Sequence, residues 1–159
     1  MRIPLVVSTF DQEEVNEVID SLESGKLTMG KKCLAFEQAF AEIDRVDSLM
    51  SRYSADGELR RLERAALDGA SASAELIAVL ARSQHFAALT GGAFDCTVGA
   101  LTALWGFPDA VAPPARAQID SALALVGYER LEVAAASIRI ARPGLRLDLG
   151  AAAKGFAVD

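Results

Sequence analysis

The chain begins with amphipathic helical patterns and ends with short runs of strand-like alternation. In residues 11–25, Val15, Val18, Ile19 and Leu22 recur at helical spacing. Asp11 is placed to cap this helix, with Glu14 three residues later completing a capping box, and Gly25 ends it. The pattern predicts an amphipathic helix at the start of the chain.

A second helix is predicted over residues 32–50, with Phe36, Phe40, Ile43, Asp47 and Met50 on its inner side. Residues 51–60 then combine Tyr53 with a turn and a charged helix start. Tyr53 either stacks on a ring or covers the edge of the core, and the pattern alone does not choose.

A third helix is predicted over residues 73–90, capped by Ser73 and ended by glycines 91 and 92. Leu76, Ile77, Leu80 and Phe86 are expected to face inward.

Two shorter helices follow in the sequence. One is predicted to be capped by Thr97 and to end at Gly106, where Pro108 forbids continuation. The other lies within residues 113–127, with proline at its start and glycine at its end.

The last third of the chain predicts three short strands, over residues 130–133, 137–141 and 145–149. Helices that precede a cluster of strands indicate an α+β fold, with helices packed on a small, mostly antiparallel sheet.

Composition narrows the class of protein. The chain has 159 residues, 52% of them hydrophobic, and a net charge of -6. This is enough for one core, and no run of Lys and Arg indicates a nucleic-acid partner. Cys33 and Cys96 are expected to be buried apolar fillers. The apolar run at residues 3–7 is too short for a signal peptide or a transmembrane segment, so the chain as written is expected to be cytoplasmic.

Two stretches of the sequence contain residues that could bind a ligand. At residues 147–154 a strand-like run meets a glycine-alanine turn and Lys154, an arrangement that suits a phosphate group near the start of a helix. The alternative is a tight connection with Lys154 in solvent. Asp95, among apolar neighbours, either caps the following helix or orients a flat aromatic ligand.

Three blocks, taken in order, resemble the ApbE family of FAD:protein FMN transferases: residues 44–59 (DRVDSLMSRYSADGEL), 91–107 (GGAFDCTVGALTALWGF) and 145–159 (LRLDLGAAAKGFAVD). The resemblance covers residues 43–159, the amino-terminal half of that domain, and implies an ApbE-like fold. It implies FAD contacts at Tyr53, Ala93, Phe94, Asp95, Asp148 and Lys154. It also implies a magnesium ligand at the carbonyl of Ala151, and it assigns no catalytic residue here.

The implied reaction transfers FMN from FAD to a Thr or Ser of a target flavoprotein and releases AMP. Glu63 departs from the family, which often has Asn there. The family's later acidic block, which completes the magnesium site, would lie beyond Asp159, so this chain is expected to be a truncated transferase with weak activity or none. Family members are usually exported or membrane-anchored.

Residues 1–42 instead resemble the amino terminus of the DegT/DnrJ/EryC-type sugar aminotransferases, which depend on pyridoxal phosphate. The sequence therefore predicts two parts, 1–42 and 43–159. Two alternatives stay open: an aminotransferase fragment, and a non-catalytic globular module that needs a partner.

Overall fold

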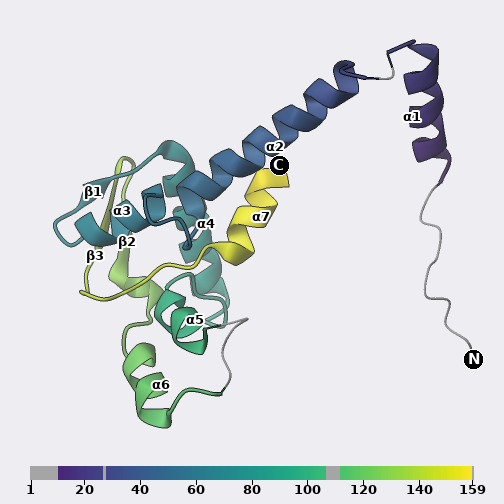
Figure 1. Cartoon of the computed structure of the whole chain (residues 1–159). Helices are drawn as coiled ribbons and strands as arrows, with labels where there is room; N and C mark the ends of the chain where they lie inside the picture. The colour runs from purple at the N-terminus through teal and green to yellow at the C-terminus, as the bar shows by residue number, and fades with distance from the viewer. Residues whose placement is uncertain (1–10, 27, 107–111, 159) are drawn as a thin grey trace, which may run out of the picture. The chain divides into compact units, whose positions relative to one another are not determined.

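The structure is a computed structural model that describes residues 11–26, 28–106 and 112–158. It divides into two compact units, Met1–Ala41 and Glu42–Asp159 (Figure 1). The predictions made for residues 3–7 and for Pro108 lie outside the described residues. No helix within the described ranges is both long enough and apolar enough to cross a membrane.

The first unit contains α1 (Gln12–Glu23), where the predicted helix and its capping box are confirmed. The Asp11 carboxylate accepts from the N–H of Glu13, and the Glu14 carboxylate accepts from the N–H of Asp11, both at 2.8 Å. Lys32, near the start of α2 (Lys31–Met50), forms an ion pair with Glu17 of α1 at 2.6 Å.

Helix α2 (Lys31–Met50) confirms the predicted second helix, but of the five positions predicted on its inner side only Met50 is buried. Phe36, Phe40 and Ile43 are 64%, 53% and 51% exposed, whereas Val46 and Met50 are buried. Only the last turns of α2 take part in the core of the second unit, and positions 46 and 50 share a helix face there.

The second unit contains a three-stranded antiparallel sheet of β1 (Ala70–Ser71), β2 (Leu131–Val133) and β3 (Ser137–Ile140), in the order β1-β3-β2. The register pairs Leu131 with Ile140 and Ala70 with Ile138. The predicted strands near 130–133 and 137–141 are confirmed.

The predicted strand at 145–149 is wrong, because this segment does not join the sheet. It runs beside the loop before α5 (Gly99–Trp105) and makes one parallel bridge, between Val98 and Arg146. Its alternation still has a structural cause, since Leu145, Leu147 and Leu149 are buried while Arg146 is exposed.

The second unit also contains the remaining helices of the chain. They are α3 (Glu58–Ala65), α4 (Ala74–Leu89), α5 (Gly99–Trp105), α6 (Arg116–Leu123), the short 3-10 helix η1 (Tyr128–Arg130) and α7 (Gly150–Val158). The α+β prediction is confirmed.

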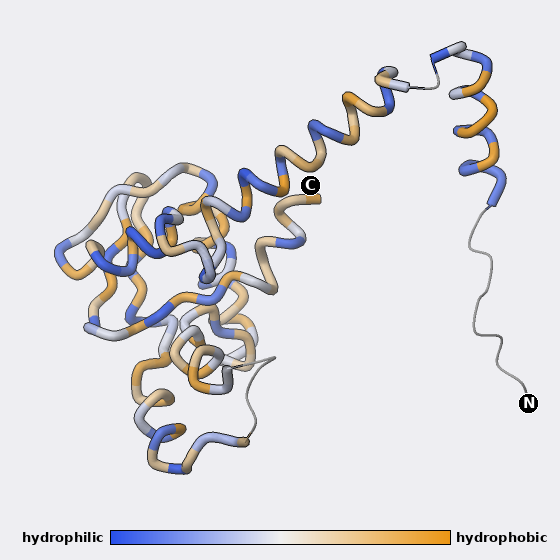
Figure 2. Tube along the Cα trace, in the orientation of Figure 1, coloured by the Kyte–Doolittle hydropathy of each residue, from blue (hydrophilic) through white to orange (hydrophobic). Residues whose placement is uncertain are grey.

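Helix α4 supplies much of the core. Ser73 caps it as predicted, and Leu76 and Leu80 are buried. Ile77 is only partly buried, and the inward placement of Phe86 is wrong, since that side chain is 50% exposed. Helix α4 contacts β2, the 3-10 helix η1 and α7. Figure 2 shows the hydrophobic residues of the second unit in orange.

The predicted cap of α5 is also wrong. The helix starts at Gly99 with Val98 in the capping position and without a side-chain cap, although it ends as predicted at Gly106 in a left-handed conformation. The Thr97 hydroxyl instead donates to Asp95 and accepts from the N–H of Gly127 at 2.8 Å.

Gly99 allows the start of α5 to lie directly against the extended segment 145–149. A Cβ atom at this position would lie 2.8 Å from the Arg146 carbonyl and from the Leu147 oxygen. Both contacts are with backbone, which has little freedom to move.

We expect Gly99→Ala to lower the free energy of unfolding by about 1–3 kcal/mol, because the backbones must separate. Gly155→Ala is the matched control, since a Cβ there meets nothing within 4 Å and alanine favours the helix. Urea unfolding followed by circular dichroism measures both. Equal stability of the two variants would contradict the close approach.

Candidate functional site

The bend at residues 148–154 joins the extended segment to α7. The Asp148 carboxylate accepts from the N–H of Gly150 at 3.0 Å, and the Leu149 carbonyl accepts from the N–H groups of Ala152 and Ala153. Three N–H groups of this first turn therefore already donate within the protein. An anion here has to be held mainly by side-chain cations.

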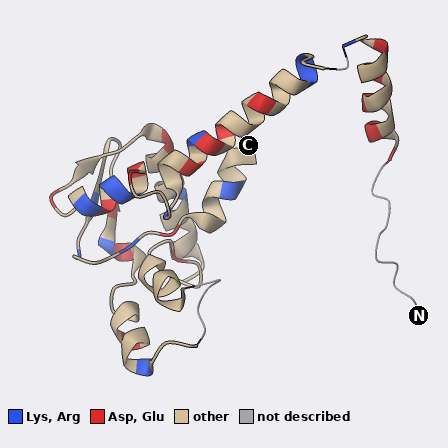
Figure 3. Cartoon of the chain, in the orientation of Figure 1, with Lys and Arg blue, Asp and Glu red and all other residues tan. Residues whose placement is uncertain are grey.

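Tyr53, Asp148 and Lys154 line one cavity of about 290 Å³, together with Arg52. The Arg52 guanidinium lies 4.4 Å from the centre of the Tyr53 ring and donates to the Tyr53 hydroxyl. Its Nε lies 3.5 Å from the Asp148 carboxylate, and both side chains are mostly buried. Lys154, the one charged residue of α7, is exposed (Figure 3).

A second cavity of about 450 Å³ continues from Tyr53 and Arg52 and is rich in arginine. Its further cations are Arg60, Arg64 and Arg146. Five cationic side chains and three carboxylates thus line the two cavities that share Tyr53, in a chain whose net charge is -6. This local excess of positive charge favours an anionic ligand.

Glu63 has a structural role at this point. Its carboxylate accepts from the N–H of Leu147 at 2.6 Å and pairs with Arg60 at 2.6 Å. Glu63 thereby connects α3 to the extended segment that leads to α7.

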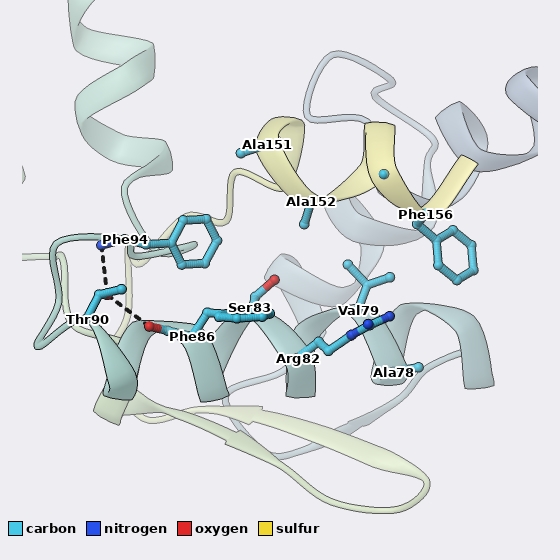
Figure 4. Close-up of a pocket in the computed structure, with 11 residues that line it drawn as sticks. Ala78, Val79, Arg82, Ser83, Phe86, Thr90, Phe94, Ala151, Ala152 and Phe156 are labelled. Atoms are coloured by element: carbon cyan, nitrogen blue, oxygen red, sulfur yellow. Dashed lines mark hydrogen bonds between the residues drawn. The ribbon is translucent and has the colours of Figure 1, made fainter. Parts of the chain in front are cut away.

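Phe94 and Ala151 line a different cavity, of about 460 Å³, between α4 and α7 (Figure 4). We call it the α4–α7 groove. Residues 151, 152, 155 and 156 of α7 face this groove, whereas 153, 154 and 157 face the cavity with Tyr53. Helical periodicity places these two sets on different faces of α7.

Asp95 lines none of these cavities. Its carboxylate accepts from the N–H and the hydroxyl of Thr97, both at 2.7 Å, and from the N–H of Tyr128 at 3.0 Å. These bonds hold the loop before α5 against the loop before β2. Asp95 therefore connects these two loops and does not cap α5.

The structure brings Tyr53, Asp148 and Lys154 together, and separately brings Phe94 to Ala151. Ala93 lies in the exposed turn directly before Phe94. Sequence reasoning missed Arg52, which contacts both Tyr53 and Asp148. Its position directly before Tyr53, in a turn that precedes a basic helix, was the available signal.

Within residues 11–26, 28–106 and 112–158, no group of three or more His, Cys, Asp or Glu side chains is arranged to hold a metal ion. A complete magnesium site needs about six oxygen ligands. The carbonyl of Ala151 alone does not provide one.

The two cysteines differ in environment, and the expectation that both are buried is wrong for Cys33, which is exposed. Burial raises the pKa of the Cys96 thiol to about 12, and the neighbouring Asp95 carboxylate adds to the effect.

We expect Asp95→Ala to lower the free energy of unfolding by about 1–3 kcal/mol, because two backbone N–H groups and the Thr97 hydroxyl lose their acceptor. Asp95→Asn retains one acceptor oxygen and should lose less. Urea unfolding of both variants tests this. If Asp95→Ala lowered the free energy of unfolding no more than Asp95→Asn does, this role of Asp95 would be contradicted.

We expect a thiol reagent at pH 8 to modify Cys33 quickly and Cys96 only after unfolding. Cys33→Ser should then leave no fast thiol. Two rapidly modified thiols in the folded protein would contradict the burial of Cys96.

The Cys96 thiol loses its proton near pH 9 in the unfolded chain and near pH 12 in the folded protein. The free energy of unfolding should therefore fall as the pH rises from 9 to 12.

Comparisons with known proteins agree on one family. The model of the ApbE family matches residues 12–159. The FAD:protein FMN transferase of Vibrio cholerae is 34% identical over 128 residues, which are 74% of this chain and 38% of the relative. That of Escherichia coli K12 is 32% identical over 131 residues, 77% of this chain and 37% of the relative.

Solved structures give the same result. Flavin transferase ApbE from Vibrio cholerae superposes with a TM-score of 0.74 at 31% identity, over 82% of this chain and 43% of that one. Pseudomonas stutzeri flavinyl transferase ApbE, in its apo form, gives a TM-score of 0.74 at 28% identity, over 82% and 42%. The chain therefore spans less than half the length of the relatives it matches.

Proposed function

Because this chain belongs to the ApbE family, we propose that it forms the FAD-binding part of an FAD:protein FMN transferase. The observation that carries the proposal is the cavity in which Tyr53, Asp148 and Lys154 meet Arg52. The reaction would transfer FMN from FAD to a Thr or Ser hydroxyl of a target flavoprotein. The family match also favours this function over an aminotransferase fragment or a non-catalytic module.

The diphosphate of FAD would bind beside Lys154 and Arg52. Each diphosphate carries two negative charges, and the N–H groups of residues 150, 152 and 153 are already used. The cations therefore supply the attraction. Arg52 is held in place by Tyr53 and Asp148, so it offers a fixed donor, whereas exposed Lys154 can move to meet the ligand.

The aromatic contacts would come from Tyr53 and from the turn that carries Ala93 and Phe94. Tyr53 is exposed and already stacks against a cation, so its outer face is free for a ring. Asp95 would position this turn rather than touch FAD, because its carboxylate oxygens accept hydrogen bonds from Thr97 and Tyr128.

In the proposed transfer, the acceptor hydroxyl attacks the phosphorus of the FMN phosphate and the bond to the AMP phosphate breaks. The oxygen of the broken bond leaves on AMP, and the proton of the hydroxyl is released. The role of Lys154 and Arg52 would be to hold the diphosphate and offset its charge.

Magnesium would take the carbonyl of Ala151 as one ligand, as the family resemblance implies. The described residues do not fit a complete magnesium centre, since they provide no acidic cluster there.

We also propose that residues 1–42 form a segment separate from the flavin-transferase part, 43–159. The support is that Glu42–Asp159 forms a compact unit with its own sheet and core. The match to the ApbE family model begins at residue 12, so it includes most of the proposed separate segment as well.

We expect Lys154→Ala to weaken FAD binding by about 1–3 kcal/mol, the range for a lost charge-assisted contact. Lys154→Arg should retain most of the affinity, and Lys31→Ala, on α2 in the first unit, is the matched control. Quenching of flavin fluorescence at low and high salt measures the dissociation constants. FAD affinity unchanged by Lys154→Ala, or absent in the folded chain, would contradict the proposal.

A further inference from the structure

The second of the two cavities that share Tyr53 is lined mainly by arginine, and we call it the arginine cavity. Its cations are Arg52, Arg60, Arg64 and Arg146, and its volume is about 450 Å³. Arg52 and Arg60 are half-buried, whereas Arg64 and Arg146 are exposed. The cavity therefore presents basic side chains both within it and on its solvent side.

The positive charge of this cavity is only partly balanced. Among the described residues, Glu63 provides the only carboxylate in the lining. One of its oxygens accepts from a backbone N–H and the other pairs with Arg60, both at 2.6 Å. Arg64 reaches only the Ala55 carbonyl, at 3.4 Å, and neither Arg64 nor Arg146 forms an ion pair within residues 11–26, 28–106 and 112–158. Two cations thus lack a counter-charge in the part of the chain that the structure describes.

Helix α3 carries three arginines within its eight residues (Figure 3). Arg60 and Arg64 lie one turn apart on it, so both side chains project from the same face of the helix. Like charges at this spacing destabilise a helix, and Arg146 adds a third cation from the extended segment. An anion bound between them would offset this repulsion. A guanidinium matches a carboxylate or a phosphate with two parallel N–H donors.

A polypeptide with carboxylates fits this cavity better than a second nucleotide does. A nucleotide base needs apolar or aromatic walls to pack against. Here the largest apolar groups of the lining are the Tyr53 ring, which is assigned to FAD, and the buried Leu145. The exposed positions of Arg64 and Arg146 also favour a ligand with several spaced charges, since one exposed ion pair contributes little.

We propose that the arginine cavity binds an acidic stretch of the target flavoprotein that lies next to the Thr or Ser accepting FMN. This inference rests on the proposed function. The arginine cavity shares Arg52 and Tyr53 with the cavity assigned to the FAD diphosphate. A segment that lies against Arg64 and Arg146 therefore passes beside the diphosphate, where its hydroxyl has to reach the phosphorus. Arg64 and Arg146 would select the target and take no part in the transfer itself.

The test uses two labelled peptides in place of a target. One has several aspartates beside a single threonine, and the other has asparagine in place of each aspartate. We expect the full chain to bind the aspartate peptide at least about tenfold more tightly by fluorescence anisotropy, and added salt to weaken this binding. Arg64→Ala and Arg146→Ala should each weaken it about 3- to 10-fold, and Arg64→Glu should weaken it more than Arg64→Ala.

Arg61→Ala is the matched control, since Arg61 is an exposed arginine of the same helix that does not line the arginine cavity. Equal binding of the two peptides would overturn the proposal. So would binding of the aspartate peptide that neither Arg64→Ala nor Arg146→Ala weakens. Displacement of the labelled peptide by inorganic phosphate as readily as by unlabelled peptide would also overturn it, because the cavity would then be a simple phosphate site.

FAD titration without peptide separates this proposal from the proposed function. Arg64→Ala and Arg146→Ala should change the FAD dissociation constant by no more than about twofold, because neither residue lines the cavity assigned to the diphosphate. A larger loss of FAD affinity in these variants would assign the arginine cavity to FAD and overturn the proposal. Failure of the unmodified chain to bind FAD would contradict the proposed function, whereas failure to distinguish the peptides would contradict the docking surface alone.

Discussion

Two backbone hydrogen bonds hold the candidate site together. The N–H of Gly99 donates to the Arg146 carbonyl at 3.1 Å, and the N–H of Asp148 donates to the Cys96 carbonyl at 2.8 Å. They join two stretches that are about fifty residues apart in sequence: the loop with Ala93, Phe94 and Asp95, and the segment that enters α7. This pairing fixes the register between the two blocks, which also share the core through Cys96 and Leu147.

Much of this arrangement could be predicted from local patterns. The capping box at Asp11, the cap at Ser73 and the end of α5 follow from a few neighbouring residues, and the structure contains them. The alternation at 145–149 was equally clear, but alternation reports which side chains are buried and not which backbone lies alongside. Its partner, the loop at Val98, carries no strand signal.

The buried side of α2 and the contacts of Arg52 could not be read from the sequence for a related reason. The spacing of Phe36 and Phe40 indicates a helix face, yet the core reaches only Val46 and Met50. Arg52 acquires its importance from Asp148, which lies close to it only after folding. Hydrophobic periodicity shows which residues share a face of a helix, but tertiary packing determines which part of that face is buried.

The way in which Arg52 is held has a consequence for selectivity. Its guanidinium is shared among the Tyr53 ring and hydroxyl, the Asp148 carboxylate and, at 3.4 Å, the Thr102 hydroxyl. A ligand therefore meets a cation whose plane is already oriented, and much of the loss of side-chain freedom has occurred during folding. Such a group discriminates by the direction of an approaching oxygen as much as by its charge, so a neutral or wrongly angled phosphate ester would gain little from it.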